Sequence, residues 1–133
     1  MLPRLRPILS EFSINELCYM CYSYYDVGYL PKLLANEIEL LCKKQLIERG
    51  DELKIEEIAL MVKVFCTTRT AHRDFHKLLE TTILLRMVDM RQNLKILHNI
   101  GLRFEESGLC SIDTLKALKK EVFQQEVEED VFN

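Results

Sequence analysis

Apolar residues recur at steps of three and four positions through most of this chain. This spacing places them on one face of an α-helix, and the 133 residues include only 4 Gly and 3 Pro to interrupt it. We expect six helices joined by short links, over roughly residues 13–25, 31–49, 55–68, 73–86, 89–104 and 111–123. The sequence therefore predicts an all-α protein.

Several helix ends carry recognisable signals. Ser13 and Glu16 have the spacing of a capping box, in which each side chain bonds the other residue's backbone amide. Pro31 suits the first turn of a helix, and Gly50 suits the position that closes one. These signals mark the first two helices as a hairpin.

A weak internal repeat links the helices. The segment 12–17 and the segment 53–58 both begin with an apolar residue and both end with an acid followed by an aliphatic residue. A third, weaker copy begins around Met90. Helix pairs that recur in this way predict a short right-handed α-solenoid of about three hairpins, the alternative being an irregular six-helix bundle. We expect one helical-repeat domain over 1–133, with an N-terminal arm at 1–11 and an acidic tail at 124–133.

Charge and hydropathy limit the partners. The formal net charge is −3, which is not typical of a free-standing nucleic-acid binder, although a local basic face remains possible. No apolar run approaches the roughly 18 residues that a membrane-spanning helix needs, so we expect no membrane span. The opening 1–7 is basic and free of acids, as in a mitochondrial presequence or an ordinary basic arm.

The cysteines and histidines form no strong metal or catalytic motif. Cys18, Cys21, Cys42 and Cys66 fall within helix-periodic apolar runs, which predicts reduced thiols in the core, while Cys110 stands apart.

A zinc site would draw on the Cys18–Cys21 pair and on His72 and His76, but the pair lies inside a helix and no second pair follows. The run His72-Arg73-Asp74 matches three letters of the kinase catalytic loop by chance, since no other kinase motif is present. We expect no metal, no cofactor and no enzymatic activity.

Cations gather near the predicted helix ends. In a stacked array these ends align, so the cations form one positive ridge that binds phosphates, or else they offset helix dipoles in solvent. The candidate phosphate-binding residues are Lys43, Lys44, Arg69, Arg73, Lys77, Arg86 and Arg91.

Tyrosines crowd the first hairpin. They cover most of the circumference of one helix, so some of them must be exposed unless a partner buries them. The candidate protein-interface residues are Tyr19, Tyr22, Tyr25 and Tyr29. Stacking on nucleic-acid bases is the alternative use for such rings.

The helix start Phe12-Ser13-Ile14-Asn15-Glu16-Leu17, the paired Leu33-Leu34 and the second start at Leu53 together resemble the helical repeats of mitochondrial FASTK and RAP-domain proteins. The resemblance covers about residues 12–118. It implies heptatricopeptide- or octotricopeptide-like repeats that attend organellar RNA or ribosomes.

We therefore expect a non-catalytic subunit of a large organellar assembly. A mitochondrial ribosome component that contacts protein and rRNA is the leading hypothesis. The alternative is a protein-only scaffold or accessory subunit of a respiratory-chain or ATP-synthase complex. Both place the chain in mitochondria.

Overall fold

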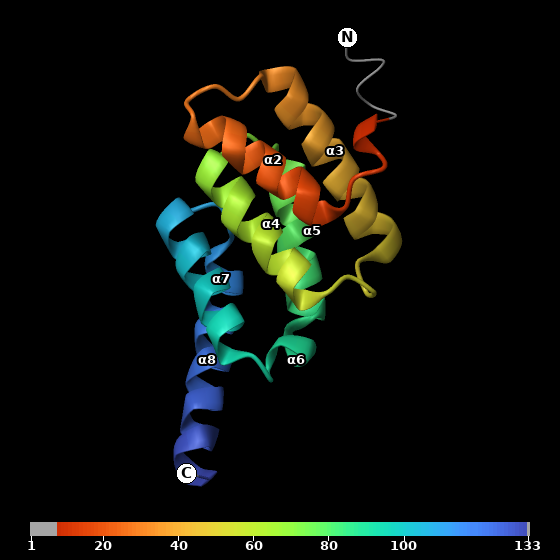
Figure 1. The fold of residues 1–133 in the computed structure, drawn as a ribbon. Coiled ribbons are helices and arrows are strands. Elements are labelled where there is room, and N and C mark those ends of the chain that lie inside the picture. The colour runs from red at the N-terminus through yellow and green to blue at the C-terminus, as the bar shows by residue number, and fades with distance from the viewer. Residues whose placement is uncertain (1–7, 133) are drawn as a thin grey trace.

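The computed structural model describes residues 8–132, without the side chains of 125 and 127–132. Its described residues contain helices and no strand, which confirms the all-α prediction (Figure 1). The helices are α2 (Ile14–Asp26), α3 (Lys32–Arg49), α4 (Ile55–Thr68), α5 (Arg73–Leu85), α6 (Met87–Met90), α7 (Leu94–Ser107) and α8 (Ile112–Phe132).

The predicted fifth helix, 89–104, was wrong at its start. A short separate helix, α6, ends at Met90, and α7 begins only at Leu94. Asn93 sits between them and caps α7, because its side-chain oxygen accepts a 3.2 Å hydrogen bond from the amide of Ile96. Burial of Met90 holds α6 against the core. The described residues therefore form seven helices instead of six.

The helices α2 and α4 begin in the same way. The predicted capping box of α2 is confirmed, with bonds of 3.0 Å from the amide of Ser13 to Glu16 and 3.2 Å in return. At the start of α4, the amide of Lys54 donates a 3.0 Å bond to Glu57. The repeat seen in the sequence thus coincides with matching helix starts.

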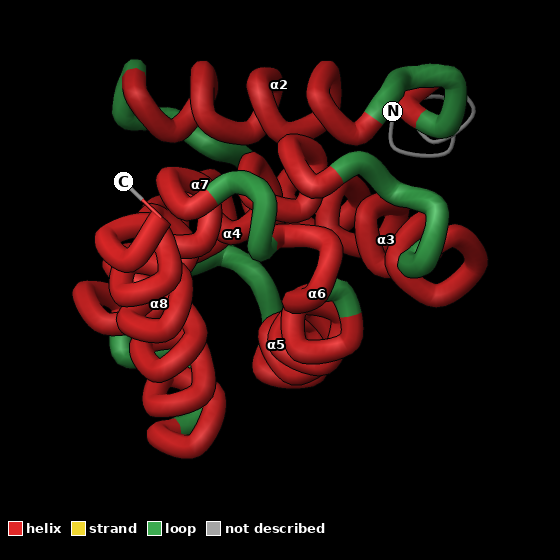
Figure 2. The backbone as a smooth tube through the Cα atoms, turned by 90° about the horizontal axis from the view of Figure 1, so that it is seen from below, coloured by secondary structure: helices red, strands yellow, loops and turns green. Residues whose placement is uncertain are grey.

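Four helices follow one another by direct contact. Helix α4 packs against α2 on one side and α7 on the other, and α8 packs on α7 (Figures 1 and 2). Alongside them, α3 contacts both α2 and α5. The far end of α8 projects beyond the other helices (Figure 1).

The helices share one apolar core. Phe65 of α4 and Phe75 of α5 are both fully buried, with ring centroids 4.6 Å apart, a distance at which aromatic rings attract. Helix α7 adds its own buried residues at the same steps of three and four as α4. The matched sets are Ile58, Met61 and Phe65 in α4, and Leu97, Ile100 and Phe104 in α7.

The structure adds detail at both expected ends. Leu9, in the segment expected to be an N-terminal arm, is 1% exposed and belongs to the core. Residues 1–7 of that segment lie outside the described residues, and so does residue 133. The stretch expected as an acidic tail continues α8 as far as Phe132, because no Gly or Pro interrupts it.

The buried face of α2 lies in its first two turns. Ile14, Leu17, Cys18 and Cys21 are buried, whereas Tyr24 and its neighbour Tyr25 are exposed. Small thiols suit a close helix contact, and a phenol hydroxyl keeps its hydrogen bonds to water when it faces outward. The last turn of α2 therefore presents tyrosine to the surface.

A buried carboxylate fixes the link before α5. Glu39 of α3 accepts a 2.8 Å hydrogen bond from the amide of His72, and its other oxygen lies 2.8 Å from the His72 ring nitrogen Nδ1. The Glu39 side chain is only 6% exposed. Its removal would leave the His72 amide, at the start of α5, without its hydrogen-bond acceptor.

We expect Glu39→Ala to lower the free energy of unfolding by about 1 kcal/mol, because the His72 amide would bond only to water. Urea denaturation measures this change. The matched control is Glu48→Ala, since Glu48 is exposed on the same helix. An equal loss in both variants would contradict a specific role for Glu39.

A second carboxylate joins α5 to the start of α8. Glu80 accepts hydrogen bonds from the Ser111 amide at 3.1 Å and from the Ser111 and Thr114 hydroxyls. Burial raises the pKa of Glu80, but these hydrogen bonds outweigh burial and hold the pKa below its ordinary value. The ionised form of Glu80 is thus favoured in the folded chain.

A carboxyl whose pKa falls on folding adds stability above its unfolded pKa, and that stability is lost as the pH falls through the folded pKa. We expect Glu80→Gln to destabilise the chain at about pH 7, and we expect a smaller difference from the wild type at about pH 3, which is below the ordinary carboxyl pKa. Urea denaturation at both values checks this. A difference that persists unchanged in acid would contradict the assignment to the Glu80 charge.

No helix among the described residues is long and apolar enough to cross a membrane.

Candidate functional site

Four of the seven cations predicted to form a phosphate-binding ridge bond other parts of the chain. Lys43 lies 2.6 Å from Asp74, and its hydrogen bond lowers the pKa of that carboxyl. Arg69 donates a 2.7 Å bond to the backbone oxygen of Ser107.

Arg86 pairs with Asp89 at 2.6 Å and donates a 2.8 Å bond to the Gly50 carbonyl, while Arg91 pairs with Glu121. These four side chains are thus already bonded to other residues of the chain.

The three remaining cations do not line one common groove. Lys44 lies on α3 beside Leu40 and Ile47, while Arg73 and Lys77 lie on α5 beside the link between α7 and α8. None of the three has an ion pair with a described residue. A continuous ridge of seven cations is therefore not what the structure presents.

The predicted interface tyrosines are mostly exposed. Tyr19 is 61% exposed and Tyr29 is 70% exposed, while Tyr25 is partly exposed and lies 6.4 Å from the half-buried ring of Tyr22. Tyr25 and Tyr29 lie at the end of α2 and in the link to α3, but Tyr19 lies mid-helix. The candidate interface tyrosines thus lie in two separate places, the middle of α2 and the end of α2 with its link to α3.

All five cysteines are free thiols, and four of them are buried as predicted. The hydrogen bond to Cys42, followed by burial, raises the pKa of Cys18, and burial raises the pKa of Cys21 to about 11. Thiols with raised pKa values are poor nucleophiles and poor metal ligands.

The two histidines considered for a zinc site have different surroundings. His72 precedes α5 and faces Glu39, whereas His76 is buried inside α5. Across the described residues, no group of three or more His, Cys, Asp or Glu side chains is placed to hold a metal ion.

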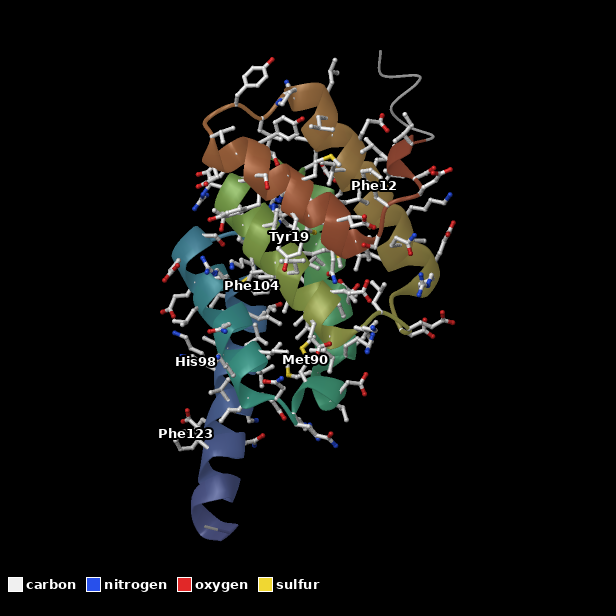
Figure 3. The ribbon with its side chains drawn as sticks, in the orientation of Figure 1. Phe12, Tyr19, Met90, His98, Phe104 and Phe123 are labelled. Atoms are coloured by element: carbon white, nitrogen blue, oxygen red, sulfur yellow. The ribbon has the colours of Figure 1, made fainter. Side chains whose placement is uncertain are left out.

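A groove runs over α4 between α2 and α7. Its volume is about 360 Å³, and side chains from all three helices line it. Figure 3 labels Tyr19, which enters the groove from α2. The polar and aromatic residues of this groove are Asn15, Tyr19, Glu56, Lys63, Asn99 and Arg103.

Helical spacing explains why these side chains share one groove. Asn15 and Tyr19 are four residues apart on α2, and so are Asn99 and Arg103 on α7. Side chains at this spacing lie on the same helix face. Because α2 and α7 both pack against α4, those two faces meet above Ala59 and Leu60.

The groove combines three kinds of chemistry. The Tyr19 ring is exposed and can stack on a planar ligand, and the amides of Asn15 and Asn99 can each donate and accept hydrogen bonds. Lys63 and Arg103 supply two positive charges against the single negative charge of Glu56. A planar ligand that carries negative charge fits this arrangement.

Sequence reasoning predicted one of these residues, Tyr19, and predicted it as a protein contact. Lys63 and Arg103 stand alone between neutral residues, so they form no visible cluster. The internal repeat is the sequence signal that could have predicted this groove. Equivalent helices of a repeat array present equivalent faces side by side.

Comparison with known proteins finds no matching family model, no matching curated protein and no matching solved structure.

Proposed function

We propose that this chain is a non-catalytic binding subunit of a mitochondrial ribonucleoprotein, and that the α2–α4–α7 groove contacts single-stranded RNA. The mitochondrial ribosome is the assembly that the sequence resemblance favours. In this proposal the helix pairs α2–α3, α4–α5 and α7–α8 act as three hairpins of a short solenoid.

The observation that carries the proposal is the composition of the groove. Proteins bind single strands through aromatic rings that stack on bases and cations that track the backbone. Tyr19 offers the ring, while Lys63 and Arg103 offer the charges within the same 360 Å³ groove. The two asparagine amides are suited to base edges.

The contacts of α4 with α2 and with α7 support the solenoid arrangement. Each hairpin of a solenoid buries its apolar face mainly against its neighbours. Ile58 of α4 and Leu97 of α7 lie at equivalent places in their helices, and both are fully buried.

A protein-only scaffold is the second candidate function. Exposed apolar side chains on the helices α3, α5 and α6 favour it, because such side chains gather at protein interfaces. They are Leu33, Leu40, Ile47, Leu84, Leu85 and Val88. Tyr25 and Tyr29 extend the possible contact surface at the other end of the first hairpin.

RNA binding by the purified chain tests the proposal. Each phosphate contact on a single strand adds a slope of about −0.7 to the dependence of log affinity on log salt. Two contacts, from Lys63 and Arg103, predict roughly a sevenfold loss of affinity between about 50 mM and about 200 mM salt. Fluorescence anisotropy of a labelled single-stranded RNA measures this loss.

Charge reversal gives the control. Lys63→Glu combined with Arg103→Glu should abolish most of the salt-dependent binding, whereas Lys44→Glu on α3 should leave it intact. A chain that binds no RNA at low salt, yet co-purifies with protein subunits alone, would favour the scaffold instead.

A further inference from the structure

A second cleft lies on another part of the molecule, between α5 and the link from α7 to α8. Its volume is about 540 Å³. Arg73, His76, Lys77 and Glu80 line one wall, and their spacing of three, four and seven positions puts them on one face of α5. The backbone and side chains of 108–111 form the opposite wall.

His76 stands out in this wall. It is only 5% exposed, and neither of its ring nitrogens has a hydrogen-bond partner within the described residues. Burial lowers the pKa of His76, so the ring is neutral and offers one N–H donor and one acceptor. Buried polar atoms without a partner are rare, because each loses its hydrogen bonds to water.

Two free cations flank this ring. Arg73 and Lys77 are exposed, and neither forms an ion pair with a described residue. The nearby Glu80 carboxylate already accepts hydrogen bonds from Ser111 and Thr114. The exposed donors of the cleft without a partner are thus the guanidinium and the ammonium, and the imidazole N–H joins them only when the ring turns toward the ligand, because both ring nitrogens are covered.

We propose that this cleft binds a small molecule through its phosphate monoester. A phosphate monoester has three outward oxygens, each with more than one lone pair, so an arginine fork can bind two of them while the ammonium and the imidazole N–H bind the remaining acceptor sites. The cleft lies in the size range of small-molecule sites and is larger than a phosphate alone needs. Ala71, Leu109 and Cys110 line the space beside the donors and contact the remainder of the ligand.

This site does not depend on the RNA groove, since none of its residues lines that groove. Charge reversal of Lys63 and Arg103 should therefore leave phosphate binding unchanged. Failure of either proposal can thus be told apart from failure of the other.

Titration of the full-length chain tests the proposal. The probes are glucose 6-phosphate, adenosine 5′-monophosphate and inorganic phosphate, with unphosphorylated glucose and citrate as controls. Calorimetry measures affinity, and NMR follows the His76 ring resonances. We expect a phosphomonoester to bind more tightly than inorganic phosphate and to shift those resonances, while glucose and citrate do neither.

Variants locate the binding. Arg73→Gln with Lys77→Gln changes only exposed side chains and should weaken binding at least about tenfold, because it removes both charged contacts to the phosphate. Lys44→Gln is the matched control and should bind as the wild type does. His76→Phe keeps the bulk of the ring without its N–H, and it should weaken binding as well.

Three results would overturn the proposal. The first is no binding of either phosphomonoester. The second is unchanged binding in the Arg73→Gln, Lys77→Gln variant, which stands as a test even if His76→Phe fails to fold. The third is equal affinity for inorganic phosphate or citrate, which would show an unselective anion contact.

Discussion

Truncation of Phe75 to alanine should lower the free energy of unfolding by about 3 to 5 kcal/mol. The Phe75 ring is fully buried, and its centroid lies 4.6 Å from that of Phe65. The substitution removes apolar surface from the core and leaves a cavity where α4 meets α5. Since domains of this size are stable by roughly 5 to 15 kcal/mol, the loss takes a large share of the total.

Urea denaturation followed by circular dichroism measures this loss as a lower midpoint with an unchanged slope. Phe123→Ala is the matched control, because the Phe123 ring is 65% exposed on α8 (Figure 3). We expect the control to change stability by less than about 0.5 kcal/mol. Similar losses in both variants would contradict the position of the core between α4 and α5.

Replacement of Tyr19 by alanine should weaken binding of single-stranded RNA by about 1 to 3 kcal/mol, the range for loss of one base-stacking ring. This corresponds to roughly a 5- to 150-fold rise in the dissociation constant. The ring is 61% exposed, so the substitution opens no core cavity and should leave unfolding almost unchanged. Anisotropy of a labelled RNA measures the change.

Two control variants separate stacking from other effects. Tyr19→Phe keeps the ring and should bind close to wild type, because stacking uses the ring face and not the hydroxyl. Tyr29→Ala removes a more exposed ring outside the groove and should also bind as wild type does. If Tyr29→Ala costs as much as Tyr19→Ala, the RNA lies on the first hairpin's outer end instead.

Local sequence signals predicted most of the helices. The Ser13 capping box and the closing residue Gly50 lie where expected, because both depend on backbone groups within a few residues. The break before α7 was missed, since the apolar spacing through Met90 and Leu94 continues across it. Only the packing of Met90 and the Asn93 cap decide that α6 is separate.

Side-chain roles were harder to predict than helices. Arg86 looked like a free cation at a helix end, but it binds the Gly50 carbonyl, a partner set by the contact between distant segments. Conversely, Lys63 and Arg103 carry no local signal and meet only because α4 packs on α7. Partners and grooves of this kind depend on tertiary contacts that sequence spacing does not encode.

Photo-crosslinking tests the central claim, that the α2–α4–α7 groove holds single-stranded RNA. A single-stranded RNA containing 4-thiouridine is irradiated with the full-length chain, and the crosslinked peptides are mapped by mass spectrometry. The proposal predicts crosslinks at Tyr19 and in the α4 and α7 segments that contain Lys63 and Arg103. Crosslinks confined to α3, or none under conditions where a known RNA-binding protein is labelled, would contradict it.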